Sequence, residues 1–125
     1  MTAAILDRAE FLSPVDDQAD LCVTALGRQL TAYVAGAGSV EEFESWFAGR
    51  ARPDRRVAGR LSAAAEVISV FEAANRTTLA AAWLREMDPS GYVPARVLRL
   101  SEGDPTTAKA LIETAIAWVQ EADLS

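Results

Sequence analysis

Apolar residues recur three and four positions apart over most of this chain, which is the spacing of helices that bury one face. No segment of strand length alternates apolar with polar residues. The pattern predicts an all-α fold, a compact bundle of six to eight helices. The most regular stripe consists of Val57, Leu61, Ala64, Ile68 and Phe71. Two further stripes consist of Cys22, Ala25, Leu26, Leu30, Tyr33 and Val34, and of Ala108, Leu111, Ile112, Ala115 and Val119.

Capping residues and helix breakers set the expected boundaries. Ser39 and Glu42 form a capping box before a short helix, and Asp54 is the expected cap of the long helix after it. Gly27 divides the first long stripe in two. The other expected boundaries are a short helix at 2–12, a break at Ser13–Pro14 with a cap at Asp16 or Asp17, helix ends at Gly36 and Gly49, a helix start at Thr77 or Thr78, a turn at 88–91, a short helix from Pro94 to Leu100, and a last helix beginning at Asp104–Pro105.

Two scarce residue types narrow the possible chemistry. The chain has no histidine and a single cysteine, Cys22, so it lacks the usual general base and cannot form a thiolate metal cluster. We therefore expect no enzymatic activity, no cofactor and no bound metal, and we expect Cys22 to be a buried structural thiol. No apolar run reaches membrane-spanning length and no export signal opens the chain, which predicts a cytoplasmic protein without a membrane contact.

The net charge of −6 disfavours non-specific binding to nucleic acid, but the charge is unevenly distributed. Five arginines lie within eleven residues, opposed there only by Asp54. They are Arg50, Arg52, Arg55, Arg56 and Arg60. This cluster is either a solvated face with local ion pairs or a surface that contacts phosphates.

Two ordered sets of motifs resemble one protein family. Trp46, Gly49 and Pro53 form a W-x-x-G-x-x-x-P frame after the capped helix at 39–48, which itself follows the segment from Leu26 to Gly36. This arrangement resembles a helix-turn-helix domain of the Xre type, with 39–48 as the recognition helix. The second half resembles the toxin-binding domain of the Xre/MbcA/ParS-like antitoxins, through Ala82–Trp83–Leu84, the Asp88–Pro89 turn, Pro94 with Val97–Leu98, and the closing helix. The resemblance covers approximately residues 25–120 and divides the chain into 1–74, with 1–15 as an additional N-terminal helix, and 75–125.

The resemblance implies a function. Such antitoxins bind a RES-domain toxin that consumes NAD and inhibit it sterically, and many also bind their own promoter. We expect this chain to form a homo-oligomer, a dimer. On this basis the expected toxin contact consists of Trp83, Leu84, Met87, Tyr92 and Pro94, since buried aromatic and apolar anchors dominate interface energies. Tyr92 could instead fold back on the core, and Trp118 is either a second contact or a half-buried edge.

The expected recognition helix departs from the family pattern because it carries Glu41, Glu42 and Glu44. Carboxylates near one groove of DNA repel the phosphates, so we hypothesise that this helix serves packing or oligomerisation. Any DNA contact would then come from Arg50, Arg52, Arg55 and Arg56. The alternatives are a stand-alone DNA-binding regulator of the Xre type and a helical adaptor without a toxin partner.

Overall fold

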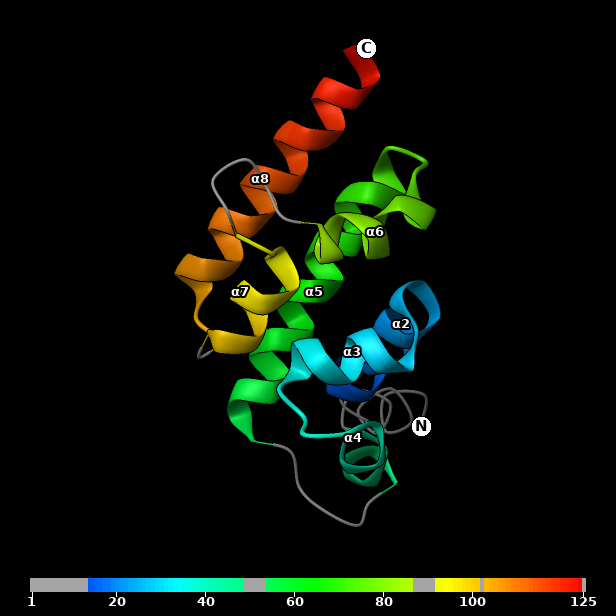
Figure 1. Cartoon of the computed structure of the whole chain (residues 1–125), viewed down its shortest axis with the longest axis vertical. Coiled ribbons are helices and arrows are strands. Elements are labelled where there is room, and N and C mark those ends of the chain that lie inside the picture. The colour runs from blue at the N-terminus through cyan, green and yellow to red at the C-terminus, as the bar shows by residue number, and fades with distance from the viewer. Residues whose placement is uncertain (1–13, 49–53, 87–91, 102, 125) are drawn as a thin grey trace, which may run out of the picture.

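A long central helix, formed by the stripe at 57–71, organises the fold (Figure 1). The computed structural model describes residues 14–48, 54–86, 92–101 and 103–124, and within these ranges it contains seven α-helices, one 3₁₀ helix and no strand. The predicted all-α class and helix number are thereby confirmed. The helices are α2 (Pro14–Leu26), α3 (Arg28–Ala35), α4 (Val40–Phe47), α5 (Arg55–Ala73), η1 (Thr77–Leu79), α6 (Ala80–Arg85), α7 (Pro94–Leu100) and α8 (Pro105–Leu124).

The predicted caps account for where three of these helices begin. The Ser39 hydroxyl accepts a hydrogen bond from the Glu42 backbone N–H at 3.1 Å, while the Glu42 carboxylate accepts from Gly38 N–H at 3.0 Å, one residue earlier than a standard capping box places it. Asp54 accepts from Arg56 N–H at 2.9 Å at the start of α5. Asp104 accepts from Thr107 N–H at 2.9 Å at the start of α8. Each carboxylate or hydroxyl thus satisfies a backbone donor that the helix leaves free.

One core joins the two halves of the chain around α5. All five residues of its predicted stripe are buried: Val57, Leu61, Ala64, Ile68 and Phe71. Helix α8 lies along one side of α5, and helices α2 and α3 lie on another (Figure 1). Helix α7 contacts both α3 and α8, whereas α6 contacts α2, α5 and α7. The first and second halves therefore share a single hydrophobic cluster in the part of the chain that the structure describes.

Two arginines from later elements bind the C-terminal end of α3. Arg60 on α5 donates from Nη1 to the Ala35 carbonyl at 3.0 Å and from Nε to the Ser101 carbonyl at 2.9 Å. Arg99 on α7 donates from Nη1 to the carbonyls of Tyr33 and Ala37, at 2.8 and 3.0 Å, and its guanidinium lies 4.8 Å from the centre of the Tyr33 ring. The Tyr33 carbonyl also accepts from Gly36 N–H at 3.1 Å, so Arg99 adds a second, charged donor there. The two cations complement the negative end of α3.

Gly36 makes this arrangement possible. Its φ of 93° gives α3 a left-handed cap, and a Cβ at this position would collide with the Arg60 guanidinium. The end of α3 at Gly36 was predicted, as was the division of α2 from α3 at Gly27, and both are confirmed. The contact between Gly36 and Arg60 could not be predicted from neighbouring residues, because the two residues are far apart in the sequence.

Two helix starts differ from prediction. Helix α2 begins at Pro14, not after a cap at Asp16 or Asp17, because proline fits the first turn of a helix, where no backbone N–H donor is required. The helix expected from Thr77 or Thr78 starts as the 3₁₀ turn η1 and becomes α-helical only at Ala80. The predictions for 2–12, for Gly49 and for the turn at 88–91 lie outside the described residues.

We expect Arg99→Ala to lower the free energy of unfolding by about 1–3 kcal/mol, because it leaves two carbonyls of the α3 end without their charged donor. The matched control is Arg96→Ala on the same helix, an exposed arginine that makes no hydrogen bond with the described residues. Urea unfolding should place the control within about 0.5 kcal/mol of the parent chain. Equal stability of the two variants would contradict the role assigned to Arg99.

The burial of Cys22 leads us to expect that the free energy of unfolding decreases at high pH. Cys22 is fully buried, its thiol donates to the Leu61 carbonyl at 3.7 Å, and burial raises its pKa from 9.0 to about 12. The unfolded chain therefore releases this proton at lower pH than the folded chain. The thiol's contribution is complete below pH 9 and falls by up to about 1.4 kcal/mol per pH unit as the pH rises toward the folded pKa.

The measurement is urea unfolding at about pH 8 and about pH 10.5, with Cys22→Ala as the reference that lacks the thiol. The variant should lose less stability over this interval than the parent chain does. Equal losses would show that Cys22 titrates as it does in the unfolded chain.

Candidate partner-binding surface

Helix α7 carries apolar side chains on two opposite faces. Its inner face packs into the core through Pro94, Ala95 and Leu98. Its outer side carries Val97 and Leu100, with Val93 immediately before the first turn. Besides Arg96 and Arg99, α7 therefore carries apolar residues on more sides than a helix with one buried face requires, yet it lies at the surface (Figure 1). Its outer face is therefore the part of the described structure that most lacks a covering partner.

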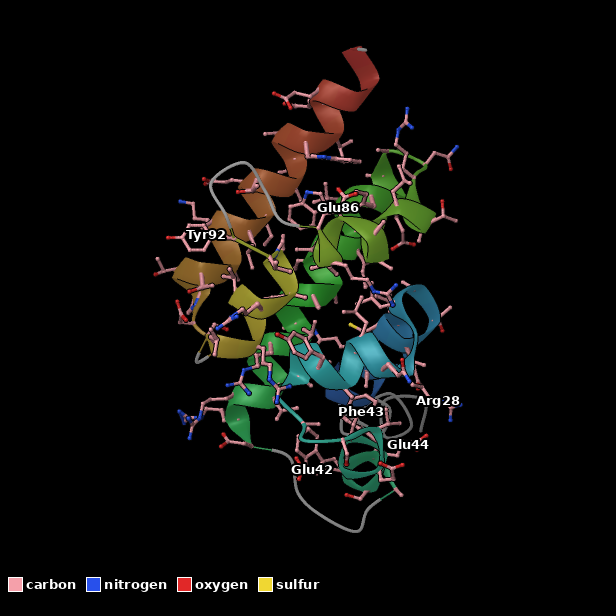
Figure 2. All side chains as sticks on the ribbon, viewed as in Figure 1. Arg28, Glu42, Phe43, Glu44, Glu86 and Tyr92 are labelled. Atoms are coloured by element: carbon pink, nitrogen blue, oxygen red, sulfur yellow. The ribbon has the colours of Figure 1, made fainter. Side chains whose placement is uncertain are left out.

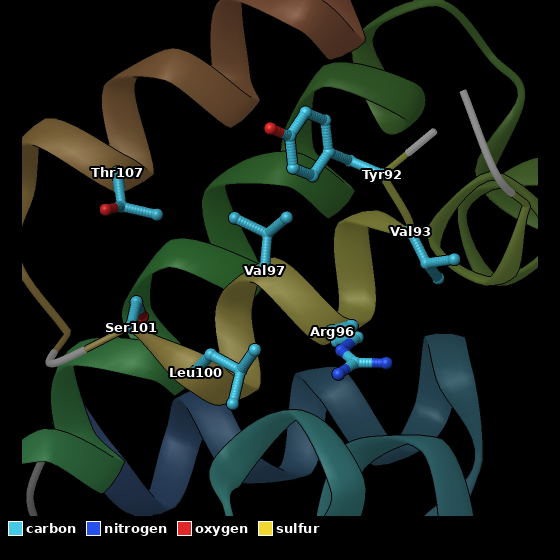
Figure 3. Close-up of a pocket in the computed structure, with 7 residues that line it drawn as sticks. All are labelled: Tyr92, Val93, Arg96, Val97, Leu100, Ser101 and Thr107. Carbon is cyan, nitrogen blue, oxygen red and sulfur yellow. The ribbon is translucent and has the colours of Figure 1, made fainter. Parts of the chain in front are cut away.

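This outer face borders a hollow of about 560 Å³ next to the first turn of α8 (Figure 3). Two of its side chains, Tyr92 and Leu100, are 63% and 69% exposed, more than any other large hydrophobic side chain described. Val97 points from α7 into the space between Tyr92 and Thr107. The lining residues are Tyr92, Val93, Arg96, Val97, Leu100, Ser101 and Thr107. Contiguous exposed apolar surface of this kind marks interaction sites in soluble proteins.

Local hydrogen bonds hold both walls of the hollow. The Ser101 hydroxyl donates to the Leu98 carbonyl at 2.7 Å and accepts from Gly103 N–H at 3.3 Å, so the chain leaves α7 in a fixed direction. On the α8 side, the Thr107 hydroxyl donates to the Asp104 carboxylate at 2.9 Å. The hollow is thus a preformed feature of the α7–α8 connection, which lowers the entropic cost of binding a partner there.

The electrostatic character of the hollow comes from Arg96. Arg96 is exposed and makes no hydrogen bond or ion pair with any described residue, while its neighbour Arg99 is held at the end of α3. A guanidinium that no described residue pairs, lying beside apolar side chains, favours a partner segment that carries a carboxylate next to its apolar anchors.

The structure separates the five residues expected to contact a toxin. Tyr92 is exposed and lines the hollow (Figure 2). Leu84 is fully buried and Trp83 is 5% exposed, with its ring 5.8 Å from that of Phe71, so both are core residues. Pro94 is also buried, where it opens α7. Met87 lies outside the described residues.

Three residues that line the hollow were not among the predicted partner contacts. They are Arg96, Val97 and Leu100. The signal for them was present in the run from Val93 to Leu100, where apolar residues occupy too many positions for a helix with a single buried face. Trp118, for which two roles were open, is half-buried, and its ring lies 5.7 Å from that of Phe71.

The second candidate surface is the outer side of α4, the expected recognition helix. Glu41, Glu42 and Glu44 are all exposed there, and Glu44 forms an ion pair with Arg28 at 3.1 Å (Figure 2). Glu42 is partly engaged as the cap of its own helix. The exposed face of α4 thus presents carboxylates, which repel DNA phosphates and offer no donor to the bases that accept hydrogen bonds.

The arginines expected to contact DNA are only partly described. Arg55 and Arg56 are exposed in the first turn of α5, and the Arg56 Nε lies 3.5 Å from the Asp54 carboxylate. The pKa of Asp54 is lowered, first by the hydrogen bond from Arg56 N–H and further by the charges of Arg56 and Arg60. Arg50 and Arg52 lie outside the described residues. Arg60 is turned toward the end of α3.

Among the described residues, no three acidic, histidine or cysteine side chains come together as metal ligands would. The Cys22 thiol stays protonated at neutral pH because its pKa is about 12, which makes it a poor nucleophile. No helix in the described ranges has the length and apolar character needed to cross a bilayer.

The role of the α7 surface has to be inferred from its own geometry and charge. It combines an apolar hollow, an exposed aromatic side chain and an exposed arginine that forms no ion pair within the described ranges. No protein-family model matches this chain, and no curated protein and no solved structure matches it.

Proposed function

We propose that this chain is a binding protein of the antitoxin type, which inhibits a cognate toxin by covering it and performs no chemistry itself. The observation that carries the proposal is the outer face of α7, where an apolar surface with Tyr92 and Leu100 at its edges lies open beside the core. The resemblance to Xre/MbcA/ParS-like antitoxins supplies the class of partner, a RES-type toxin that consumes NAD.

The composition of the α7 surface supports binding of a protein segment. Tyr92 and Leu100 supply large contact areas, and Val97 forms the floor between them and α8. Arg96 at the edge favours an acidic residue of the toxin. Because Trp83 and Leu84 are committed to the core, we replace them as proposed contacts by Val97 and Leu100, and we keep Tyr92.

A stand-alone DNA-binding regulator of the Xre type, acting as a homodimer, is the second candidate. It is favoured by the order of α3, the turn at Gly36 and α4, and by the exposed arginines Arg55 and Arg56 at the start of α5. The carboxylates of α4 weigh against it. Autoregulation of an operon would need the same DNA contact, so it is subject to the same objection.

We expect Leu100→Glu to weaken binding to the cognate toxin by at least about 2 kcal/mol, roughly thirtyfold in Kd, because it places a carboxylate in the apolar contact. The matched control is Leu21→Glu on α2, since Leu21 is also an exposed leucine. The two variants are compared by co-expression with the NAD-consuming toxin encoded beside this chain, with cellular NAD and the Kd of the purified pair as readouts.

Loss of protection with Leu100→Glu, but not with Leu21→Glu, supports both the toxin and the α7 surface. Unchanged protection by both variants places the contact elsewhere on the chain. Failure of the parent chain to bind any NAD-consuming toxin rejects the antitoxin function itself.

For the DNA-binding alternative, we expect only weak binding to the duplex upstream of the gene at about 0.05 M salt and none at about 0.2 M, because α4 presents carboxylates to the groove. Any residual binding should be lost in Arg55→Ala/Arg56→Ala, since those side chains would contact phosphates. Fluorescence anisotropy over several salt concentrations provides the measurement. Tight binding whose affinity falls steeply with salt would favour the regulator.

A further inference from the structure

A second apolar groove, separate from the α7 surface, lies along the C-terminal halves of α5 and α8. The two helices run side by side in the same direction there (Figure 1). The groove has a volume of about 510 Å³ and shares no lining residue with the hollow at α7. Its lining residues are Ser69, Val70, Ala73, Ala74, Ile116, Val119 and Gln120.

The lining is uncharged and made mostly of small side chains. Ile116 is 40% exposed, and Val119 is buried at the base. Ser69, Ala73 and Ala74 have short side chains, which allow the backbone of another helix to approach closely. Phe71 and Trp118, on the same two helices, are in ring contact, so their packing holds α5 and α8 together. The groove therefore lies between two helices whose relative position is already fixed in the free protein.

The charges around this groove are negative at both ends. Glu66 lies one turn before Ser69 and Val70 on α5, and Glu113 lies one turn before Ile116 on α8. Both glutamates are exposed and form no ion pair with described residues. At the other end, Ala73 and Ala74 are the last residues of α5, which has no basic residue in its last turn, so the negative end of its dipole is uncompensated by its own side chains.

Two basic residues lie near the groove, and neither belongs to its lining. Lys109 is the nearest on α8, two turns before Ile116, and the last turn of α8 has no basic residue. Arg76 follows α5, is half-buried and already has an interaction partner. Lys109 also lies one turn before Glu113, but the exposed glutamates on these halves of α5 and α8 outnumber it, so the charge around the groove is negative. They are Glu66, Glu72, Glu113 and Glu121.

We propose that this groove binds a basic amphipathic helix of another protein, with its apolar side chains on Val70 and Ile116 and its lysines or arginines beside Glu66, Glu113 and the C-terminal end of α5. A second copy of this chain fits less well. Two copies with grooves aligned in the same direction oppose glutamate to glutamate, and two copies in opposite directions oppose the glutamates to the negative end of α5.

This surface is independent of the proposed toxin contact. The proposal requires only the groove and its charges, so it holds or fails whether or not α7 binds a toxin. The test accordingly uses Leu100→Glu as an internal reference, because a charge on α7 should leave binding at the α5–α8 groove unchanged.

The probe is a fluorescein-labelled model helix of about 18 residues, built from leucines spaced three and four apart and flanking lysines, at about 0.15 M salt. We expect it to bind the full chain and to bind Glu66→Lys/Glu113→Lys at least about tenfold more weakly. The matched control is Asp20→Lys/Glu41→Lys, which changes the net charge equally at two exposed positions on α2 and α4, neither of which lines the groove. Binding to this control should remain within about twofold of the parent chain.

Ile116→Gln should also weaken binding several-fold, because it removes apolar surface at a partly exposed position without changing the charge. Circular dichroism of each variant checks that the fold is intact. Three results would overturn the proposal. They are equal losses in the two double charge variants, equal binding of a probe with glutamates in place of lysines, and a dimer of the parent chain that Ile116→Gln dissociates in sedimentation.

Discussion

The rest of the structure depends on how the C-terminal end of α3 is held. Its free carbonyls are bound by Arg60 from α5 and Arg99 from α7, two residues that lie 25 and 66 positions beyond their partners Ala35 and Tyr33. Charged donors suit this position because the helix end is negative and its last carbonyls have unused acceptor capacity. One cluster of bonds thereby fixes three elements relative to one another, and it ties the first half of the chain to the second.

This constraint determines which face of α7 is left open. The bond from Arg99 to α3 and the burial of Leu98 fix the orientation of α7 about its own axis. Val97 and Leu100 therefore cannot turn inward, and Arg96 cannot turn toward α3. Arg96 and Arg99 are identical residues three positions apart, yet Arg99 joins α7 to α3, whereas Arg96 is exposed and bonds to no described residue. Because α7 is held by its bonds to α3 and by its buried residues, its outer side has the same geometry in the free protein as a binding surface would need. Less conformational entropy is then lost on binding.

Features governed by neighbouring residues could be predicted from the sequence, and features governed by tertiary packing could not. Caps at Ser39, Asp54 and Asp104 depend on residues two or three positions away, and the buried face of α5 follows from its spacing. Burial of Trp83 depends on Phe71, twelve positions earlier, which local spacing does not reveal. Likewise, α7 has apolar residues on more than one side, so its sequence does not reveal which side is buried. Tertiary packing, including that of Arg99 on α3, buries Pro94, Ala95 and Leu98.

The sign of the charge distinguishes the two apolar surfaces more sharply than their shape does. Both are grooves between helices of similar size, so hydrophobic contact alone would let them accept similar segments. Arg96 favours a carboxylate at the α7 surface, whereas Glu66 and Glu113 favour lysine or arginine at the α5–α8 groove. A segment suited to one therefore meets like charge at the other. Specificity is a difference between affinities, so the opposite charges beside the two apolar surfaces would make each surface prefer a different segment.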